Sequence, residues 1–202
     1  MKLNEFAKEV HQNAVDHGWW EEERTFGEIV ALCHSELSEA LEEFRAGRPM
    51  VRCVGFEFNK NCVDACTGLE CLTRFDDGLM PEGIAVELAD CIIRILDWLG
   101  RKDMNVDELV EEARLYMFCD VPVSARAASL GDHIARWHLL LSLGYSCWCR
   151  GSGLDAAALR MALCIYEIMA WAEENGVDME KILTLKHAYN KGRPYRHGGK
   201  VL

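Results

Sequence analysis

Residues 81–100 read PEGIAVELADCIIRILDWLG, and this stretch decides the fold of the chain. Its apolar residues recur every three or four positions, which is the period of an α-helix that buries one wide face. Proline near the first turn and glycine after the last favour the beginning and the end of a helix. Glu87 and Asp90 lie three residues apart within it, so one helical face carries two carboxylates.

A second stretch, residues 25–44, repeats this arrangement earlier in the chain. Thr25 is a suitable N-cap and Glu28 follows it three residues later, a pairing typical of a capping box. Glu36 and Glu39 have the same spacing as the first acidic pair, again on one face of the predicted helix.

Two such helices packed face to face would bring Glu36, Glu39, Glu87 and Asp90 to one place. Four carboxylates in one cleft repel one another unless a cation lies between them. Oxygen ligands without histidine or cysteine suit Mg²⁺, and Mn²⁺ is possible. The alternative is that both acidic pairs lie on solvated helix faces, as many such pairs do.

The rest of the chain also has mainly helical periodicity, interrupted by one long irregular segment. We expect one all-α domain over residues 1–202, divided into a first half, a degenerate second half and a basic tail. The expected parts are helices at 3–17, 25–44, 81–99, 105–115, 125–143, 154–174 and 178–189, an irregular cysteine-rich insertion at 50–80, a loop at 144–153, half boundaries near 1–120 and 124–190, and a tail at 191–202.

The composition restricts the possible partners of the chain. Half of the 202 residues are hydrophobic and four are proline, which suits a helical globular protein. A formal net charge of -11 argues against binding a nucleic acid polymer through its phosphates. Neither a signal peptide nor a membrane span is visible, so the sequence predicts a cytoplasmic protein without a membrane partner.

The two halves resemble each other as a degenerate internal repeat. Residues 89–109 align with residues 162–182, with Val106 matched to Val177 after a one-residue slip, and residues 27–34 align more weakly with residues 131–138. In the second half, Leu140, Leu143, Arg160 and Leu163 stand where the first half has its four acids. Basic residues follow only the last helix, so acids from one half and cations from the other would form one composite site. The alternative is a chance likeness of amphipathic helices.

These residues resemble the MazG-like group of all-α nucleoside triphosphate pyrophosphohydrolases. The resemblance rests on Glu36-x-x-Glu39, on Glu87-x-x-Asp90 and on the terminal KHAYNKGRPYRHGGK. It covers residues 26–49, 81–109 and 170–200. It implies a helical bundle that binds Mg²⁺ through the four acids and hydrolyses a ribo- or deoxyribonucleoside triphosphate to the monophosphate and pyrophosphate, in control of a nucleotide pool. Dimers are common in that group, so a pseudo-dimeric monomer or a homodimer is expected here. The lost second acidic set and the cysteine-rich insertion depart from its pattern.

Site roles follow from the charges and the spacing. Glu39 is our hypothesis for the base that orients the attacking water, with Glu36 beside it, although spacing alone does not separate a base from a metal ligand. Arg94 could contact a phosphate, or pair with Glu87 or Asp97 on its own helix. The other candidates for substrate binding are Lys186, Tyr189, Asn190 and Arg193 at helical spacing, His197 and Lys200 in the tail, and Trp20 for stacking on a base. A basic last turn that complements the helix dipole is the alternative for the first four.

Four cysteines of the insertion form a possible zinc site. They are Cys53, Cys62, Cys66 and Cys71. Four thiols in a loop could hold Zn²⁺, but the spacing C-x8-C-x3-C-x4-C lacks the paired C-x-x-C of common zinc sites, so unligated thiols are the alternative.

Two other functions are consistent with the same residues. One is a non-catalytic nucleotide-binding or regulatory protein built on the helical bundle. The other is a protein-interaction domain with a zinc-bound loop. Intact acidic pairs favour the enzyme over both.

Overall fold

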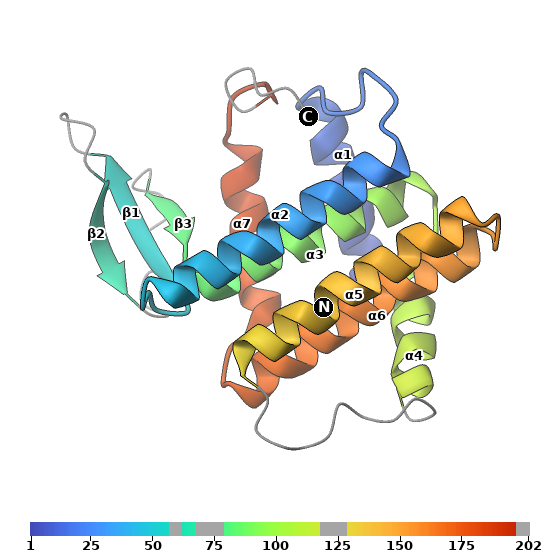
Figure 1. The fold of residues 1–202 in the computed structure, drawn as a ribbon. Coiled ribbons are helices and arrows are strands. Elements are labelled where there is room, and N and C mark those ends of the chain that lie inside the picture. Colours follow the sequence, from blue (N-terminus) through green and yellow to red (C-terminus); the bar gives the residue numbers. More distant parts are fainter. Residues whose placement is uncertain (57–61, 68–78, 118–128, 197–202) are drawn as a thin grey trace.

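The computed structural model describes residues 1–56, 62–67, 79–117 and 129–196, and this part of the chain is mostly helical, as predicted (Figure 1). The elements are α1 (Leu3–Asp16), α2 (Phe26–Arg45), β1 (Arg52–Phe56), β2 (Cys62–Thr67), β3 (Met80–Glu82), α3 (Ile84–Arg101), α4 (Val106–Met117), α5 (Leu130–Cys149), α6 (Leu154–Glu174) and α7 (Met179–Lys191). Among the described residues, no helix is both long enough and apolar enough to cross a membrane.

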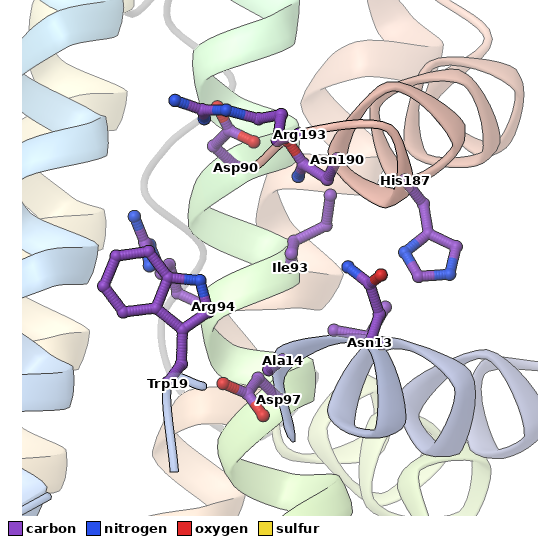
Figure 2. A pocket seen from close by; sticks show the side chains of 11 residues that line it. Asn13, Ala14, Trp19, Asp90, Ile93, Arg94, Asp97, His187, Asn190 and Arg193 are labelled. Carbon is purple, nitrogen blue, oxygen red and sulfur yellow. The ribbon is translucent and has the colours of Figure 1, made fainter. Parts of the chain in front are cut away.

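Helix α3 is the centre of the bundle, as its wide apolar surface predicts. It packs against α1, α2, α6 and α7, and Ile92, Ile95 and Leu96 have no exposed surface. Helices α2 and α3 lie side by side, as do α5 and α6, and α2 packs on α5 (Figure 1). The last helices cross over, because α4 packs on α6 while α7 packs on α3. Helices α1, α3 and α7 together surround a pocket (Figure 2).

Local capping explains where two of the long helices begin. The predicted capping box of Thr25 and Glu28 starts α2, and Ser129 with Asp132 forms the same motif before α5. Each box satisfies backbone N–H groups that the first turn leaves without a helical partner.

Helix α5 differs from the prediction at both ends. It begins after Ser129 rather than at residue 125, and it continues through the predicted loop to Cys149. The glycine that suggested a break, Gly144, is buried inside the helix, and a Cβ atom there would lie 3.5 Å from the carbonyl oxygen of Ala157 on α6. That is an ordinary van der Waals distance, so the helix continues through this glycine because α5 packs along α6.

The prediction of an irregular insertion at residues 50–80 is wrong for the part that is described. Three antiparallel strands form a sheet in the order β2-β1-β3, with Cys53 opposite Cys66 and a register irregularity after Cys53. The buried guanidinium of Arg52 bonds Glu43 of α2 at 3.0 and 3.1 Å and also bonds Glu82 of β3. The pair with Glu43 attaches the sheet to the C-terminal end of α2, and the pair with Glu82 joins β1 to β3. The sequence does not reveal this tertiary contact, because the strands are short and rich in cysteine and glycine.

Candidate active site

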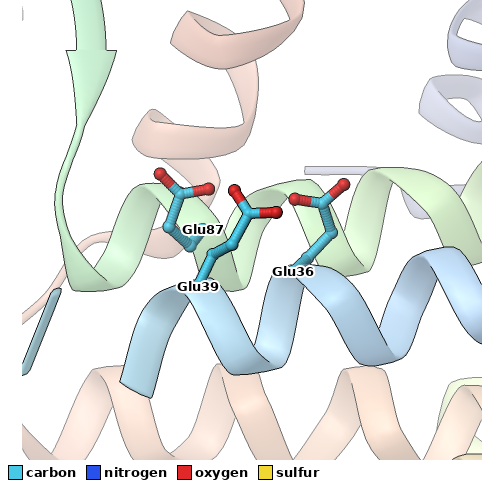
Figure 3. Close-up of side chains that lie close together, drawn as sticks. All are labelled: Glu36, Glu39 and Glu87. Carbon is cyan, nitrogen blue, oxygen red and sulfur yellow. The ribbon is translucent and has the colours of Figure 1, made fainter. Parts of the chain in front are cut away.

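Three of the four predicted carboxylates meet on one side of the α2–α3 pair. Glu36 and Glu39 of α2 and Glu87 of α3 each place an oxygen within 4.8 Å of the others, and all three side chains point the same way (Figure 3). Glu36 and Glu87 are buried, whereas Glu39 is exposed. We call these residues the acidic trio.

The fourth predicted carboxylate, Asp90, is held by a cation from the second half of the chain. Its Oδ2 lies 2.8 Å from Nζ of Lys186 on α7, and Lys186 is itself buried. Lys186 also reaches the carbonyl oxygen of Pro81 at 3.5 Å. Acids of the first half and a cation of the second half therefore lie together.

Burial makes two members of the trio unusually weak acids. Burial raises the pKa of Glu36 to about 7, and the neighbouring charge of Asp90 adds to the increase while Arg94 opposes it. Burial and Asp90 likewise raise the pKa of Glu87 to about 8, against the attraction of Lys186. Near neutral pH, these carboxyls therefore carry only part of their charge unless a further cation neutralises them.

Arg94 faces the trio across the helix pair. Its Nε donates to Oε1 of Glu36 at 3.1 Å, so its partner in the ion pair lies on α2. The sequence had suggested Glu87 or Asp97 of its own helix as the partner instead. Arg94 also lines the pocket at α1, α3 and α7. It thus connects the acidic trio to that pocket.

The pocket has a cavity volume of about 70 Å³, and polar groups from three helices line it (Figure 2). Its polar and aromatic lining residues are Asn13, Trp19, Asp90, Arg94, Asp97, His187, Asn190 and Arg193. Asp90 and Arg94 line this pocket, and Arg94 also bonds Glu36 of the acidic trio. The pocket therefore adjoins the carboxylates.

Two buried polar atoms in the pocket have no hydrogen-bond partner among the described residues, namely Nε2 of His187 and Oδ1 of Asn190. Burial lowers the pKa of His187 to about 4, and the nearby charge of Lys191 lowers it further, so the ring is neutral at physiological pH. Buried polar atoms without partners are costly, and a polar ligand in the pocket would satisfy them. The sequence analysis missed His187, although it lies three residues before Asn190 on the same helical face.

The two adjacent tryptophans lie in different surroundings. The indole N–H of Trp20 donates to Asp97 at 2.9 and 3.1 Å, and Nδ1 of His11 lies 2.8 Å from the same carboxylate. Trp19, which the sequence analysis did not select, is the one that lines the pocket (Figure 2). Two adjacent residues that follow the end of a helix have side chains that point in different directions. The sequence alone does not say which of these side chains faces a pocket.

The remaining predicted residues are distributed as follows. Tyr189 lies beside Lys186 and Arg193, with its ring centre 5.8 and 5.9 Å from their charged groups, while Asn190 and Arg193 reach the pocket. His197 and Lys200 lie outside the described residues.

The predicted zinc ligands are only partly described. Cys53 is buried in β1, Cys62 and Cys66 belong to β2, and Cys71 lies outside the described residues. The zinc prediction therefore stays untested.

The α5–α6 pair carries an ion pair of its own. Arg136 of α5 bonds Glu167 of α6 at 2.7 to 2.9 Å. In the part of the chain that is described, the acidic trio is the only group of three or more histidine, cysteine or acidic side chains close enough to share an ion.

Comparison with known proteins gave no match, either to a protein-family model or to a curated protein or a solved structure. The functional argument therefore rests on the residues of the site.

Proposed function

We propose that this chain hydrolyses a ribo- or deoxyribonucleoside triphosphate to the monophosphate and pyrophosphate with the help of Mg²⁺, and thereby controls a nucleotide pool. The observation that carries the proposal is the acidic trio beside a pocket with cationic and aromatic walls. A triphosphate needs both features, because its negative charge must be neutralised while its nucleoside is held.

The residues of the trio fit a divalent cation of the Mg²⁺ or Mn²⁺ type. All three offer hard oxygen atoms, and burial, followed by the charge of Asp90, raises the pKa values of Glu36 and Glu87, so a cation that binds there would stabilise their ionised forms. Bound there, the ion would link the carboxylates to phosphate oxygens and neutralise charge on the departing pyrophosphate. Asp90 is a fourth acid nearby, and its carboxylate forms an ion pair with Lys186.

Glu39 is the residue to which we assign the proton transfer. It is the exposed member of the trio, so water reaches it, and Ser35 orients its carboxylate through a 3.0 Å hydrogen bond. In this mechanism a water oxygen forms a bond to the α-phosphorus, Glu39 accepts the water's proton, and the α–β anhydride bond breaks to release pyrophosphate.

The cations and the pocket would hold the two ends of the substrate. Arg94 and Lys186 lie next to the acids and are available to phosphate oxygens. Asp97 lies two helical turns beyond Asp90 on α3, about 10 Å away at the rise of an α-helix. The pocket at that end, with Trp19 in its wall, is the place for the nucleoside.

We infer that the two halves are an internal repeat and that one chain holds one complete site. Both α3 and α6 begin after a glycine with positive φ, Gly83 at 115° and Gly153 at 95°, although Gly153 lies three residues before the position aligned with Gly83. His34 and His138, matched by the sequence alignment, lie with their Nδ1 atoms 2.6 Å apart and their rings stacked. Equivalent residues that touch each other are expected at a two-fold axis.

The turns that follow support the same repeat without the one-residue slip assumed from the sequence. The backbone φ is positive at Asp103 and at Gly176, and Asn105 and Asp178 then cap α4 and α7 through side-chain oxygens. These residues are equivalent when residues 89–109 are aligned with 162–182 position by position.

The first test is hydrolysis of a panel of nucleoside triphosphates with Mg²⁺, with pyrophosphate and phosphate measured separately. Glu39→Gln should lower the turnover number at least about a hundredfold, because it removes the base and one oxygen ligand of the proposed ion, while the pocket and the cations around it are kept. Glu42→Gln, on the exposed face of α2, is the matched control and should keep wild-type turnover. Nucleotide binding without any hydrolysis would instead favour the non-catalytic, regulatory function.

A second test concerns the repeat. Activity per chain should not depend on protein concentration, and sedimentation should find an active monomer. Activity confined to a dimer would contradict the composite site.

A further inference from the structure

A second pocket lies between α1, α4, α6 and the start of α7, away from the acidic trio. Its cavity volume is about 630 Å³, and its apolar wall includes Leu3, Val110, Tyr166 and Met169. No role has been assigned to it so far. Its size is sufficient for a small organic molecule.

This second pocket occupies the repeat position of the nucleotide pocket but has different chemistry. Under the alignment of the halves, Ile93 and Asp97 of the nucleotide pocket correspond to Tyr166 and Ala170 here, and all four line their respective pockets. A carboxylate has thus been replaced by a small apolar residue, and an aliphatic residue by an aromatic one. The position equivalent to Arg94 is Glu167, which is already bonded to Arg136.

Charge at the second pocket favours cations over phosphates. Its charged lining residues are Glu173, Asp178 and Glu180, and the described wall includes no lysine or arginine. Asp178 caps α7, and Glu180 bonds the amino group of Met1 at 2.6 Å. Glu173 is exposed at the rim and is the acid available to a ligand.

The cations near the second pocket are already paired with acids. Arg114 lies near Tyr166, but its guanidinium is bonded to Glu111 at 2.6 and 2.8 Å. Tyr166 therefore offers a half-buried ring beside an acidic rim, a combination that attracts an organic cation with an apolar body.

Two helices connect this second pocket to the nucleotide pocket. Helix α1 has Leu3 at the second pocket and Asn13 at the first, and α7 has Met179 at the second and Asn190 at the first. Each helix spans roughly 15 Å between the two, at 1.5 Å per residue. A ligand that shifts the near end of either helix also moves a wall of the nucleotide pocket.

We propose that the second pocket binds a small aromatic ammonium compound and that its occupancy changes nucleotide affinity through α1 and α7. The binding part stands on the second pocket alone, whereas the coupling part rests on the proposed function. By linkage, the nucleotide must change the affinity of the ammonium compound by the same factor.

The test uses three indole compounds that differ in charge, namely tryptamine, neutral tryptophol and anionic indole-3-acetate. Binding is measured by amide chemical shifts of the whole chain without nucleotide. Tryptamine should perturb Leu3, Met169 and Val177 with a Kd of about 1 mM or tighter, with weaker effects of tryptophol and none of indole-3-acetate. Equal effects of all three, or shifts elsewhere only, would overturn the proposal.

Two variants test the same point without disturbing the core. Glu173→Gln should weaken tryptamine binding about threefold, as expected for one exposed charge, while Glu174→Gln on the neighbouring exposed position should not. Ala170→Phe, which fills the pocket, should abolish binding. Unchanged affinity in both Glu173→Gln and Ala170→Phe would contradict the assignment.

Coupling is read separately from binding. Saturating tryptamine should change the KM for the triphosphate about fivefold or more, and Ala170→Phe should remove that response. If tryptamine binds as predicted but no triphosphate is hydrolysed, the proposed function fails and the binding site stands. If hydrolysis occurs with a KM that ignores bound tryptamine, the coupling is overturned.

Discussion

At the scale of single residues, Glu36 and Glu87 decide the chemistry of the site. Each is a carboxyl that burial has made reluctant to ionise, and Arg94 and Lys186 offset the resulting cost only in part. Such groups gain stability either from a proton or from a cation that replaces it. The spacing of the acids was readable from the sequence, but their burial was not, because burial depends on which helices cover them.

Replacing Glu87 with glutamine should stabilise the protein without divalent ions. The neutral amide removes a buried charge that its surroundings disfavour, so the free energy of unfolding at pH 8 should rise by about 1–3 kcal/mol. Addition of Mg²⁺, which should stabilise the wild type, should then have little effect. Urea unfolding with and without Mg²⁺ measures both quantities, and Glu112→Gln on the exposed face of α4 should change neither. A less stable Glu87→Gln protein would argue against a strained carboxyl.

The two tryptophans should separate binding from stability. Trp19→Ala should raise the KM for the triphosphate about tenfold or more, because a base loses its stacking partner. Trp20→Phe should instead cost about 1–2 kcal/mol of stability, because Asp97 loses a hydrogen bond from the indole N–H. Steady-state kinetics and thermal unfolding of both variants distinguish the roles. A larger KM effect from Trp20→Phe would restore the assignment made from the sequence.

At the scale of elements, helix ends are set by local chemistry and helix partners are not. Thr25 with Glu28 could be recognised as a helix start from the sequence, and so could Asn105. In contrast, the crossover of α4 and α7 onto the opposite halves depends on complementary apolar faces that are far apart in the chain. This crossover places Lys186 of α7 beside Asp90 of α3.

The glycines before α3 and α6 give a matched pair of element-scale variants. Both have positive φ, so alanine is strained at either position. At Gly83, however, a Cβ atom would also lie 2.8 Å from the carbonyl oxygen of Met50, whereas nothing lies within 4 Å at Gly153. Gly83→Ala should therefore lose about 2 kcal/mol more stability than Gly153→Ala in urea unfolding. Equal losses would show that the contact with the sheet is not tight.

At the scale of the whole molecule, the stability of the protein without divalent ions should depend on pH in a definite direction. The pKa values of Glu36 and Glu87 are raised above 4.5, to about 7 and about 8, so their contribution is complete below pH 4.5 and disappears as the pH rises through 7 and 8. His187 acts oppositely, because its pKa is lowered from 6.5 to about 4, and stability is lost as the pH falls between those values. Stability should therefore be higher at pH 6 than at pH 9.

Divalent ions should reverse the alkaline part of this profile. Mg²⁺ needs ionised carboxylates, so its stabilisation should grow from pH 6 to pH 9 and offset a loss of roughly 3 kcal/mol. Thermal unfolding across this range, with Mg²⁺ or with a chelator, measures the effect. Curves that coincide at every pH would argue against a metal at the trio.

The helical periodicity, the paired acids and the capping residues were enough to predict a mostly helical protein and three carboxylates that meet. They could do so because an amphipathic pattern and i, i+3 spacing are local properties of the chain. The small sheet, the extension of α5 past Gly144 and the choice of Trp19 over Trp20 were not predictable in this way. Each of them depends on what packs against the residue from elsewhere in the chain.

The sequence by itself determined the helices and the residue types available to the site. Only the tertiary structure decided which acid is exposed, that Arg94 pairs with Glu36 across two helices, and that Asp90 is held by Lys186. The physical reason is that burial and charge pairing arise between helices that are distant in the sequence. Burial by a neighbouring helix shifts the pKa of a carboxyl, and packing decides which charged side chains become partners.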